Sequence, residues 1–230
     1  MSSADKQFVL LVSGSPQKVS PELLWELSEG MSFVVAVDSG GQLCADAGVI
    51  PDLLIGDMDS VSAEVRAAFA EQEVEEVVFA GEKDASDLEL ALQLIGQRGY
   101  TDLVATNILG GRIDHELAAL GSLVAAGQAG LAITVVEEGQ TLIFLNNPGV
   151  RQQLQMNFFS RVEQDAAPMI SLIPWGGPAV VSAKGFRWEL EQAELSPNSS
   201  LGVSNYPVAA TPLVELHEGA LIIVVQTPAV

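Results

Sequence analysis

Residues 51–60 read PDLLIGDMDS, and the interpretation of the whole chain starts from this stretch. Its apolar residues Leu53, Leu54 and Ile55 predict a short buried strand, and Asp57 and Asp59 follow it directly. In extended backbone, residues two positions apart project to the same side, so the two carboxylates would face one point. Such a pair suits Mg²⁺, which binds one or two carboxylates besides water and phosphate oxygens. A solvated turn after a strand would also explain the pair, so this stretch alone leaves both interpretations open.

Outward from this stretch, the first 146 residues alternate short apolar runs with segments of helical period. The runs fall at 8–12, 33–37, 52–55, 76–79, 103–106 and 132–136. Helices are expected at 21–29, 62–71, 87–97 and about 114–126, with Ser20 as one N-cap and Ser86 and Glu89 as a capping box for another. The alternation predicts an α/β domain, with an open, mainly parallel sheet and helices on both faces.

After residue 146 the pattern changes to short β-type segments. They are expected at 169–174, 179–182, 186–190, 213–217 and 220–226, separated by turn sequences such as Gly176-Gly177-Pro178. No helical period lies between them. The sequence therefore predicts two domains, an α/β domain over residues 1–146 and an all-β, sandwich-like domain over residues 147–230.

Composition narrows the classes of function. The 230 residues include 10 basic and 30 acidic side chains, for a net charge of −20, and 48% of the residues are apolar. A chain this acidic repels nucleic-acid phosphates and anionic lipid, so neither is an expected partner. The single cysteine, Cys44, fits a reducing compartment. Because no apolar run is long enough for a signal peptide or a membrane span, a cytoplasmic protein is expected.

Three further groups place carboxylates or paired glycines near expected strand ends. Asp84 and Asp87 lie at the start of the capped helix, where the helix dipole favours a carboxylate even without a function. VDSGG at 37–41 and GGRIDH at 110–115 each follow a strand, and paired glycines let backbone approach a ligand closely. Arg112 adds a cation for phosphate oxygens. Since ligands bind at the carboxyl ends of parallel strands, these groups together predict a site.

The order of these motifs resembles that of the thiamin pyrophosphokinase family, whose members transfer a diphosphate from ATP to thiamin. The resemblance is carried by VDSGG at 37–41, PDLLIGDMDS at 51–60, DASD at 84–87, GGRIDH at 110–115, KGFRWEL at 184–190 and SN at 204–205. It spans nearly the whole chain. It implies an N-terminal α/β domain followed by a β-sandwich domain that binds thiamin and forms a homodimer, with active sites between subunits.

The resemblance also implies roles for single residues. Mg²⁺ and, through it, the phosphates of ATP would be held by Asp57, Asp59 and Asp87. The catalytic residues would be Asp38, Arg112 and Asp114, and either carboxylate could accept the proton of the thiamin hydroxyl. The phosphates would contact Gly40, Gly41, Gly110, Gly111 and Arg112. Thiamin would face Ser204 and Asn205.

Some positions depart from the family pattern. Ser39 stands where the family usually has glycine, and the run at 221–225 has no aromatic residue on which thiamin could stack. Two alternatives therefore stay open, a Mg²⁺-nucleotide transferase acting on another small alcohol and a non-catalytic thiamin or nucleotide sensor. The intact acidic set with Arg112 argues against a sensor, which does not need it. Trp188 is expected to pack in a core or an interface, and Glu137 to lie on the solvated surface.

Overall fold

The computed structural model describes residues 7–79, 84–155 and 168–227. The chain forms two compact units, Met1–Glu138 and Gly139–Val230. The division falls before residues 146/147, where the sequence suggested a boundary. The reason is strand β7 (Gln140–Leu145), which pairs along its whole length with β13 (Leu221–Gln226) of the second unit.

The first unit is built on a parallel sheet, as the sequence predicted. Its strands are β1 (Phe8–Val12), β2 (Phe33–Val37), β3 (Leu53–Gly56), β4 (Glu75–Val78), β5 (Asp102–Thr106) and β6 (Ala132–Glu137), in the order β4-β3-β2-β1-β5-β6. Every neighbouring pair among them is parallel. The chain adds β2, β3 and β4 on one side of β1 and then β5 and β6 on the other. Such a reversal opens a crevice at the carboxyl ends of the strands, where ligands of open α/β sheets bind.

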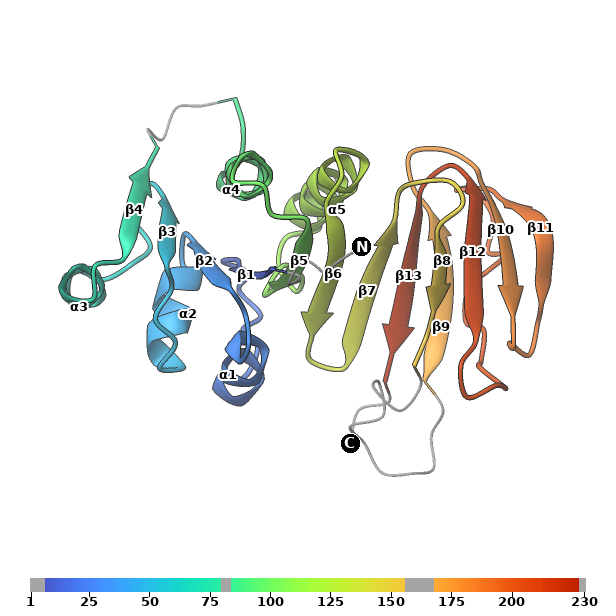
Figure 1. Cartoon of the computed structure of the whole chain (residues 1–230), viewed down its shortest axis with the longest axis horizontal. Helices are drawn as coiled ribbons and strands as arrows, with labels where there is room; N and C mark the ends of the chain where they lie inside the picture. Colours follow the sequence, from blue (N-terminus) through green and yellow to red (C-terminus); the bar gives the residue numbers. More distant parts are fainter. Residues whose placement is uncertain (1–6, 80–83, 156–167, 228–230) are drawn as a thin grey trace, which may run out of the picture. The chain divides into compact units, whose positions relative to one another are not determined.

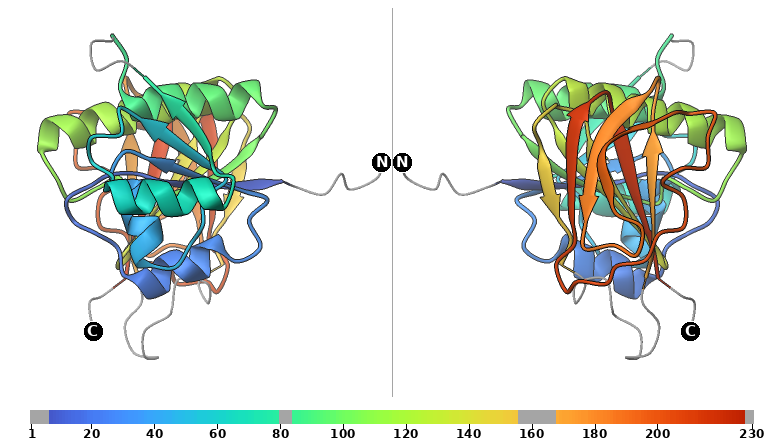
Figure 2. Two further views of the ribbon diagram at one scale, coloured as in Figure 1. Left: turned by 90° about the vertical axis from the view of Figure 1, so that its left-hand side faces the viewer. Right: turned by 90° about the vertical axis from the view of Figure 1, so that its right-hand side faces the viewer.

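Helices cover both faces of this sheet (Figure 1). They are α1 (Pro21–Ser28), α2 (Gly40–Asp46), α3 (Ala63–Glu71), α4 (Asp87–Gln97) and α5 (Ile113–Gln128). The views of Figures 1 and 2 place α1, α2 and α3 on one face and α4 and α5 on the other. Ser20, Ser62 and Ser86 each accept a hydrogen bond from a backbone N–H in the first helical turn, as N-caps do. Helix α5 runs on to Gln128, past the end expected at Ala126.

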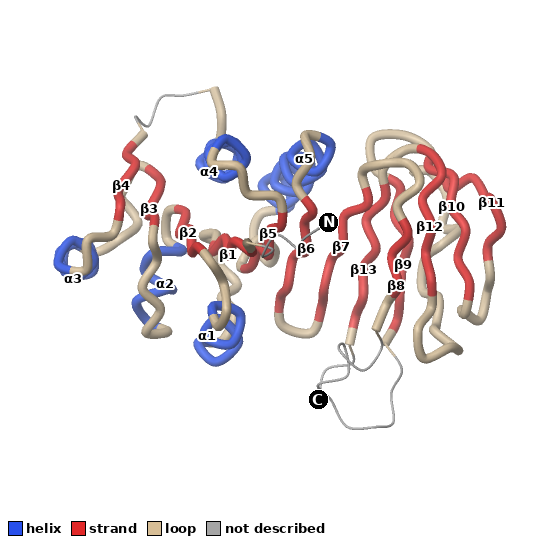
Figure 3. The backbone as a smooth tube through the Cα atoms, viewed as in Figure 1, coloured by secondary structure: helices blue, strands red, loops and turns tan. Residues whose placement is uncertain are grey.

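The second unit contains two antiparallel sheets. One has the order β7-β13-β9 and the other β11-β10-β12-β8, with β8 (Arg151–Gln153), β9 (Met169–Pro174), β10 (Ala179–Lys184), β11 (Leu190–Leu195) and β12 (Leu213–Glu218). Buried side chains from both sheets, among them Leu172, Val181 and Ile223, form one core, which confirms the predicted sandwich. The tube in Figure 3 shows strands and loops but no helix in the described part of this unit.

One predicted strand is wrong. Residues 186–189 form no strand: Phe186 makes an isolated bridge to Pro207, bends follow it, and the next strand begins at Leu190. Among the described residues, no helix is long and apolar enough to cross a membrane.

Candidate active site

The motif loops of the first unit leave the carboxyl ends of its parallel strands. Asp38 directly follows β2, Asp57 follows β3, and the loop from Asn107 to Arg112 joins β5 to α5. The loop after β1 is tied to the loop after β5, since Ser15 N–H donates to Asn107 O over 3.0 Å and Asn107 Nδ2 donates to Ser13 O over 2.8 Å. The motif loops of the first unit therefore leave the same edge of its sheet, and the loops after β1 and β5 are joined there by hydrogen bonds.

Unusual backbone conformations gather in these loops. Asp38, Met58 and Asn107 have φ values of 51°, 67° and 58°, in the left-handed region that non-glycine residues rarely adopt. In the second unit Ser204, within the SN motif, has a φ of 59°. Such residues cluster at functional sites, because surrounding packing must hold them there.

The left-handed turn at Met58 sets the geometry of Asp57 and Asp59. Met58 is buried in the core of the unit, while both aspartates are exposed. Asp59 N–H donates to Asp57 Oδ1 over 3.1 Å, which closes a tight turn. The reason given from sequence, an extended backbone, is therefore wrong. The tight turn, and not an extended strand, brings the two aspartates together.

The electrostatics of this turn fit a cation. A hydrogen bond with Asp57 and the negative charge of that carboxylate raise the pKa of Asp59, and the charge of Asp87 raises it further. Asp87 is the first residue of α4, directly after the Ser86 cap. The three predicted metal ligands thus share one electrostatic environment, and a divalent cation would relieve the repulsion between them.

The donor set fits Mg²⁺ better than a metal bound by protein alone. Across the described residues, no three His, Cys, Asp or Glu side chains are grouped to hold an ion by themselves. Mg²⁺ needs no such group, because it keeps water and substrate phosphate in its shell beside one or two carboxylates. The DASD motif at 84–87 begins directly after residues 80–83, which lie outside the described residues.

Packing explains the paired glycines after β2. A Cβ at Gly40 would collide with Val12 O, and a Cβ at Gly41 would lie 2.7 Å from Leu54 Cδ1. Both glycines are buried where α2 crosses the sheet. They let the helix approach β1 and β3 closely, and this sets the position of Asp38 just before it.

The glycines of the β5–α5 loop are also packed, and their amides already have acceptors. Gly110 and Gly111 N–H both donate to Glu116 Oε1, over 2.9 and 2.6 Å. A Cβ at Gly110 would collide with Gln17, and a Cβ at Gly111 would lie 2.9 Å from Pro16 Cδ. In this conformation, a phosphate could bind the two amides only by displacing the Glu116 carboxylate.

Arg112 and Asp114 form a pair beside these glycines. Arg112 Nε and Nη2 donate to Asp114 Oδ1 and Oδ2 over 3.1 and 2.5 Å. Both side chains are largely exposed, so both can reach a ligand. The hydrogen bond from Arg112 lowers the pKa of Asp114, which makes that carboxylate a weaker base.

Glu137 is a residue that the sequence analysis missed. It is only 8% exposed, so the expectation that it lies on the solvated surface is wrong. Its carboxylate accepts the N–H groups of Asn107, Ile108 and Leu109. Burial raises its pKa to about 7, even though these backbone hydrogen bonds lower it. The signal was present in the sequence, because Glu137 continues the alternation of Ile133 and Val135, which point into the core.

In the second unit, Asn205 faces inward. It is 4% exposed, its Nδ2 donates to Trp188 O over 2.7 Å, and its Oδ1 accepts from Trp188 N–H and Tyr206 N–H. Trp188 is 53% exposed, so it does not pack in the core of its own chain. Its ring lies beside that of Tyr206, with centroids 6.3 Å apart, and the Arg187 guanidinium lies 5.0 Å from its centroid. Asn205 therefore shapes a loop that exposes Trp188, and Ser204 lies next to it.

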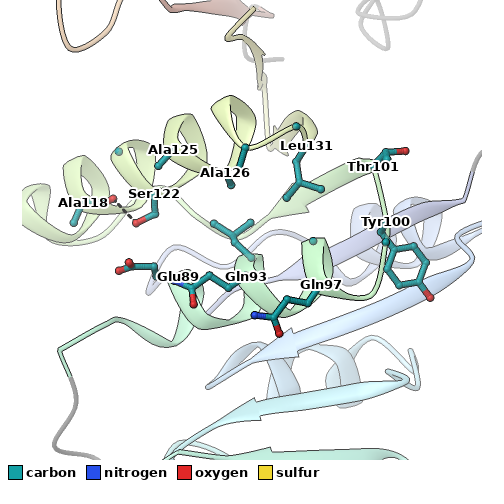
Figure 4. Close-up of a pocket in the computed structure, with 16 residues that line it drawn as sticks. Glu89, Gln93, Gln97, Tyr100, Thr101, Ala118, Ser122, Ala125, Ala126 and Leu131 are labelled. Atoms are coloured by element: carbon teal, nitrogen blue, oxygen red, sulfur yellow. Dashed lines mark hydrogen bonds between the residues drawn. The ribbon is translucent and has the colours of Figure 1, made fainter.

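A separate groove runs between α4 and α5, with a volume of about 1030 Å³ (Figure 4). Gln93 and Gln97 line it from α4, and Ala118, Ser122 and Ala125 from α5. None of the predicted site residues is among the described residues that line this groove. It is therefore not the site to which the motifs point.

Comparison with protein families gives two matches that follow the two units. A model described as "Thiamin pyrophosphokinase, catalytic domain" matches residues 24–135. A model described as "Thiamin pyrophosphokinase, vitamin B1 binding domain" matches residues 160–221. The first match contains all the acidic motifs, and the second contains Trp188, Ser204 and Asn205.

Individual proteins agree with these matches. Thiamine pyrophosphokinase of Bacillus subtilis is 26% identical over 219 residues, which cover 94% of this chain and 97% of the relative. Thiamine pyrophosphokinase 1 of rice is 25% identical over 162 residues, covering 67% of this chain and 58% of the relative. Among solved structures, the Bacillus subtilis thiamine pyrophosphokinase has a TM-score of 0.82 at 24% identity, over 97% of this chain and all of the other. Yeast thiamin pyrophosphokinase has a TM-score of 0.77 at 14% identity, over 96% and 86%. These structural likenesses show the shared fold.

Proposed function

We infer that this chain, which belongs to the thiamin pyrophosphokinase family, transfers the diphosphate of ATP to the hydroxyl of thiamin and releases AMP. The observation that carries this proposal is the meeting of the acidic motifs with Arg112 at one sheet edge, inside the match to the family's catalytic domain. A non-catalytic sensor would not need this set of residues. Another alcohol as acceptor has no observation in its favour beyond the aromatic residue missing from 221–225.

The acidic turn would bind the metal. We assign Asp57, Asp59 and Asp87 to Mg²⁺, because Asp57 and Asp59 share one tight turn, Asp57 and Asp87 raise the pKa of Asp59, and carboxylates suit a hard divalent cation. When bound, Mg²⁺ neutralises charge on the ATP phosphates. The acidic turn by itself would repel ATP. With Mg²⁺ bound, the same region can bind the ATP phosphates.

The reaction forms one P–O bond, breaks another and transfers one proton. The thiamin hydroxyl oxygen attacks the β-phosphorus of ATP, the bond from that phosphorus to the α-phosphate oxygen breaks, and AMP leaves with the electron pair. The hydroxyl proton goes to a carboxylate. We assign that role to Asp38, because Arg112 keeps the pKa of Asp114 low. Asp38 stands at the end of β2, next to the metal-binding turn after β3.

Arg112 would stabilise the phosphates as charge develops on them. Its planar guanidinium now holds both oxygens of Asp114 and can hold two phosphate oxygens in the same way. Gly40, Gly41, Gly110 and Gly111 would contribute by shaping the loops around the nucleotide. Such preorganised charge is the main source of rate in phosphoryl-type transfer.

The second unit would bind thiamin. Trp188 presents an exposed aromatic face, and aromatic faces attract cations such as the thiazolium ring of thiamin. Arg187 lies over the same ring, so the thiazolium would take the face that Arg187 leaves open. Ser204 would offer its hydroxyl to the pyrimidine. Asn205, buried beneath, would hold the Trp188 loop in place.

We further propose that the protein is a homodimer in which the α/β unit of one subunit and the β unit of its partner complete each site.

The compartment that we propose is the cytoplasm, with no nucleic-acid or membrane partner, in keeping with the net charge of −20 and a buried free cysteine, Cys44. Burial raises the pKa of the Cys44 thiol to about 12, which keeps it unreactive.

Incubation with MgATP and thiamin tests the activity. We expect AMP and thiamin diphosphate in equal amounts, and neither product when Mg²⁺ is chelated. AMP formed only with a different alcohol would identify another transferase. Binding of both substrates without turnover would identify a sensor.

Subunit mixing tests the dimer. Asp57→Asn and Trp188→Ala damage opposite halves of the proposed site, so each variant alone should have little activity. Mixed dimers should recover part of it, since one of their two sites regains both halves. Light scattering should give twice the mass of the chain. A monomeric mass with full activity would contradict the shared site.

A further inference from the structure

The loop that carries the GGR motif has an unusual hydrogen-bonding pattern. Five consecutive backbone N–H groups, from Asn107 to Gly111, all donate to two carboxylates. Glu137 takes the first three and Glu116 the last two. Arg112, the N-cap of α5, comes directly after this run. The loop is therefore fixed by two carboxyl side chains immediately before the arginine.

Glu137 is the buried member of this pair and makes close contacts. Ile108 N–H and Leu109 N–H donate to its Oε1 over 2.6 and 3.2 Å, and Asn107 N–H donates to its Oε2 over 3.1 Å. It comes from the last residue of β6, so a rigid strand end holds it. In its ionised form, a carboxylate that accepts several backbone N–H groups fixes the loop strongly, because hydrogen bonds to a charged acceptor are stronger than neutral ones.

The same residues connect this clamp to the neighbouring strand end. Asn107, in its left-handed conformation, donates from Nδ2 to Ser13 O and Ser15 O and accepts from Val19 N–H. Ser15 Oγ also donates to Leu109 O. The clamp therefore fixes the loop after β5 relative to the loop after β1, which is the point where the strand order reverses.

We propose that Glu137 is a positioning residue for Arg112, acting through the backbone amides of Asn107, Ile108 and Leu109. This proposal rests on the proposed function, in which Arg112 contacts the transferring phosphate. Glu137 itself touches no substrate. It provides the fixed geometry that a bidentate contact to phosphate requires, since small displacements of such a group cost much of the rate.

The chemistry of the clamp explains why a carboxylate is needed. Glutamine has the same shape, but its Nε2 would face the N–H of one of the three amides, donor against donor. Glu137→Gln should therefore loosen the loop without opening a cavity. Glu137→Asp keeps the charge and moves it back by one methylene. The neighbour Glu138 is the matched control, because it is exposed and accepts a hydrogen bond from Ser20 N–H, outside the Asn107–Gly111 loop.

A double-mutant cycle tests the coupling. We expect Glu137→Gln to lower kcat about tenfold, which is the scale of one lost hydrogen bond to a charged group, with the thiamin KM within about twofold. In an Arg112→Ala background the same change should have little further effect, because its target is gone. Glu137→Asp should retain more activity than Glu137→Gln, and Glu138→Gln should match the parent. Losses that add in the double variant would show a purely structural role and overturn the proposal.

A second measurement separates this proposal from the proposed function. The Arg112 Nε–H signal in NMR reports the position of the guanidinium whether or not the protein turns over thiamin. It should shift in Glu137→Gln and stay in place in Glu138→Gln. An unchanged signal in Glu137→Gln would overturn the positioning role. A parent protein that forms no thiamin diphosphate, but whose Arg112 signal shifts in Glu137→Gln, would contradict the proposed function and support the positioning role.

Discussion

The Asp38 carboxylate occupies the space in which a side chain at Gly56 would begin, because a Cβ built on Gly56 would collide with Asp38 Oδ1. Gly56 ends β3, Asp38 directly follows the neighbouring strand β2, and Asp38 N–H donates to Ile55 O over 2.9 Å. Gly56 also has a φ of 150°, which side chains rarely adopt. The missing side chain at Gly56 therefore lets the proposed base lie directly beside the proposed metal-binding turn.

We expect Gly56→Ala to displace Asp38. Turnover should fall about tenfold to a hundredfold, since displacing a reacting group by about 1 Å can lower the rate about a hundredfold. Stability should fall by about 1–3 kcal/mol, because the new methyl group overpacks a tight site. Urea unfolding and AMP release measure the two effects. Gly96→Ala is the control, because a Cβ there meets nothing within 4 Å, and it should stabilise α4 by up to about 1 kcal/mol.

Neutralising the acidic turn should remove activity and leave the fold intact. Asp57→Asn keeps an oxygen that can accept Asp59 N–H, so the turn survives while its charge is lost. We expect Asp57→Asn and Asp59→Asn each to lower kcat at least about a hundredfold, the scale of one lost element of preorganised charge. Asp46→Asn, an exposed aspartate on α2, should leave kcat unchanged. Near-parental activity in both turn variants, measured over a range of Mg²⁺ concentrations, would refute the metal assignment.

Arg112→Lys should reduce turnover although it keeps the charge. An ammonium cannot hold two oxygens in a fixed plane, so we expect kcat to fall about tenfold or more with the thiamin KM little changed. Arg66→Lys is a matched control, because Arg66 forms the same two-bond pair with Glu76. That pair is on the surface, so its loss should change stability by less than about 1 kcal/mol. Steady-state kinetics that show a defect only in the thiamin KM would move Arg112 away from the phosphates.

The contribution of Glu137 to the stability of the fold should decrease as the pH rises. Its folded-state pKa is raised to about 7 from the ordinary 4.5. A raised folded pKa means that the folded protein holds the proton more tightly than the unfolded chain. This contribution is complete below the unfolded pKa and is lost as pH rises through about 7. The Glu137→Gln variant lacks this contribution to stability, because its side chain does not titrate. The stability of the parent relative to the variant should therefore fall by up to about 3 kcal/mol between pH 4 and pH 8. Urea unfolding of both proteins across that range measures the difference, and parallel pH curves would contradict it.

Local patterns in the sequence determined much of this protein. Alternating apolar runs and the capping serines Ser20 and Ser86 predicted the parallel sheet and the starts of α1 and α4, because strand period and N-caps depend on residues close together in the chain. The sequence also placed Asp57 and Asp59 together, although the left-handed turn at Met58, and not the strand period, brings them close. Motif order indicated the family without any knowledge of the fold.

Contacts between distant residues were decided only by the tertiary structure. Glu137 continues the core-facing alternation of β6, but the tertiary structure decided which groups its carboxylate binds, since those amides lie some thirty positions earlier in the chain. Asn205 faces inward because the backbone of Trp188 takes its amide, and that leaves the tryptophan exposed. β7 belongs to the second unit because it pairs with β13, far away in the chain. Hydrogen-bond partners and strand pairing depend on which segments meet in space, and a local pattern does not contain that information.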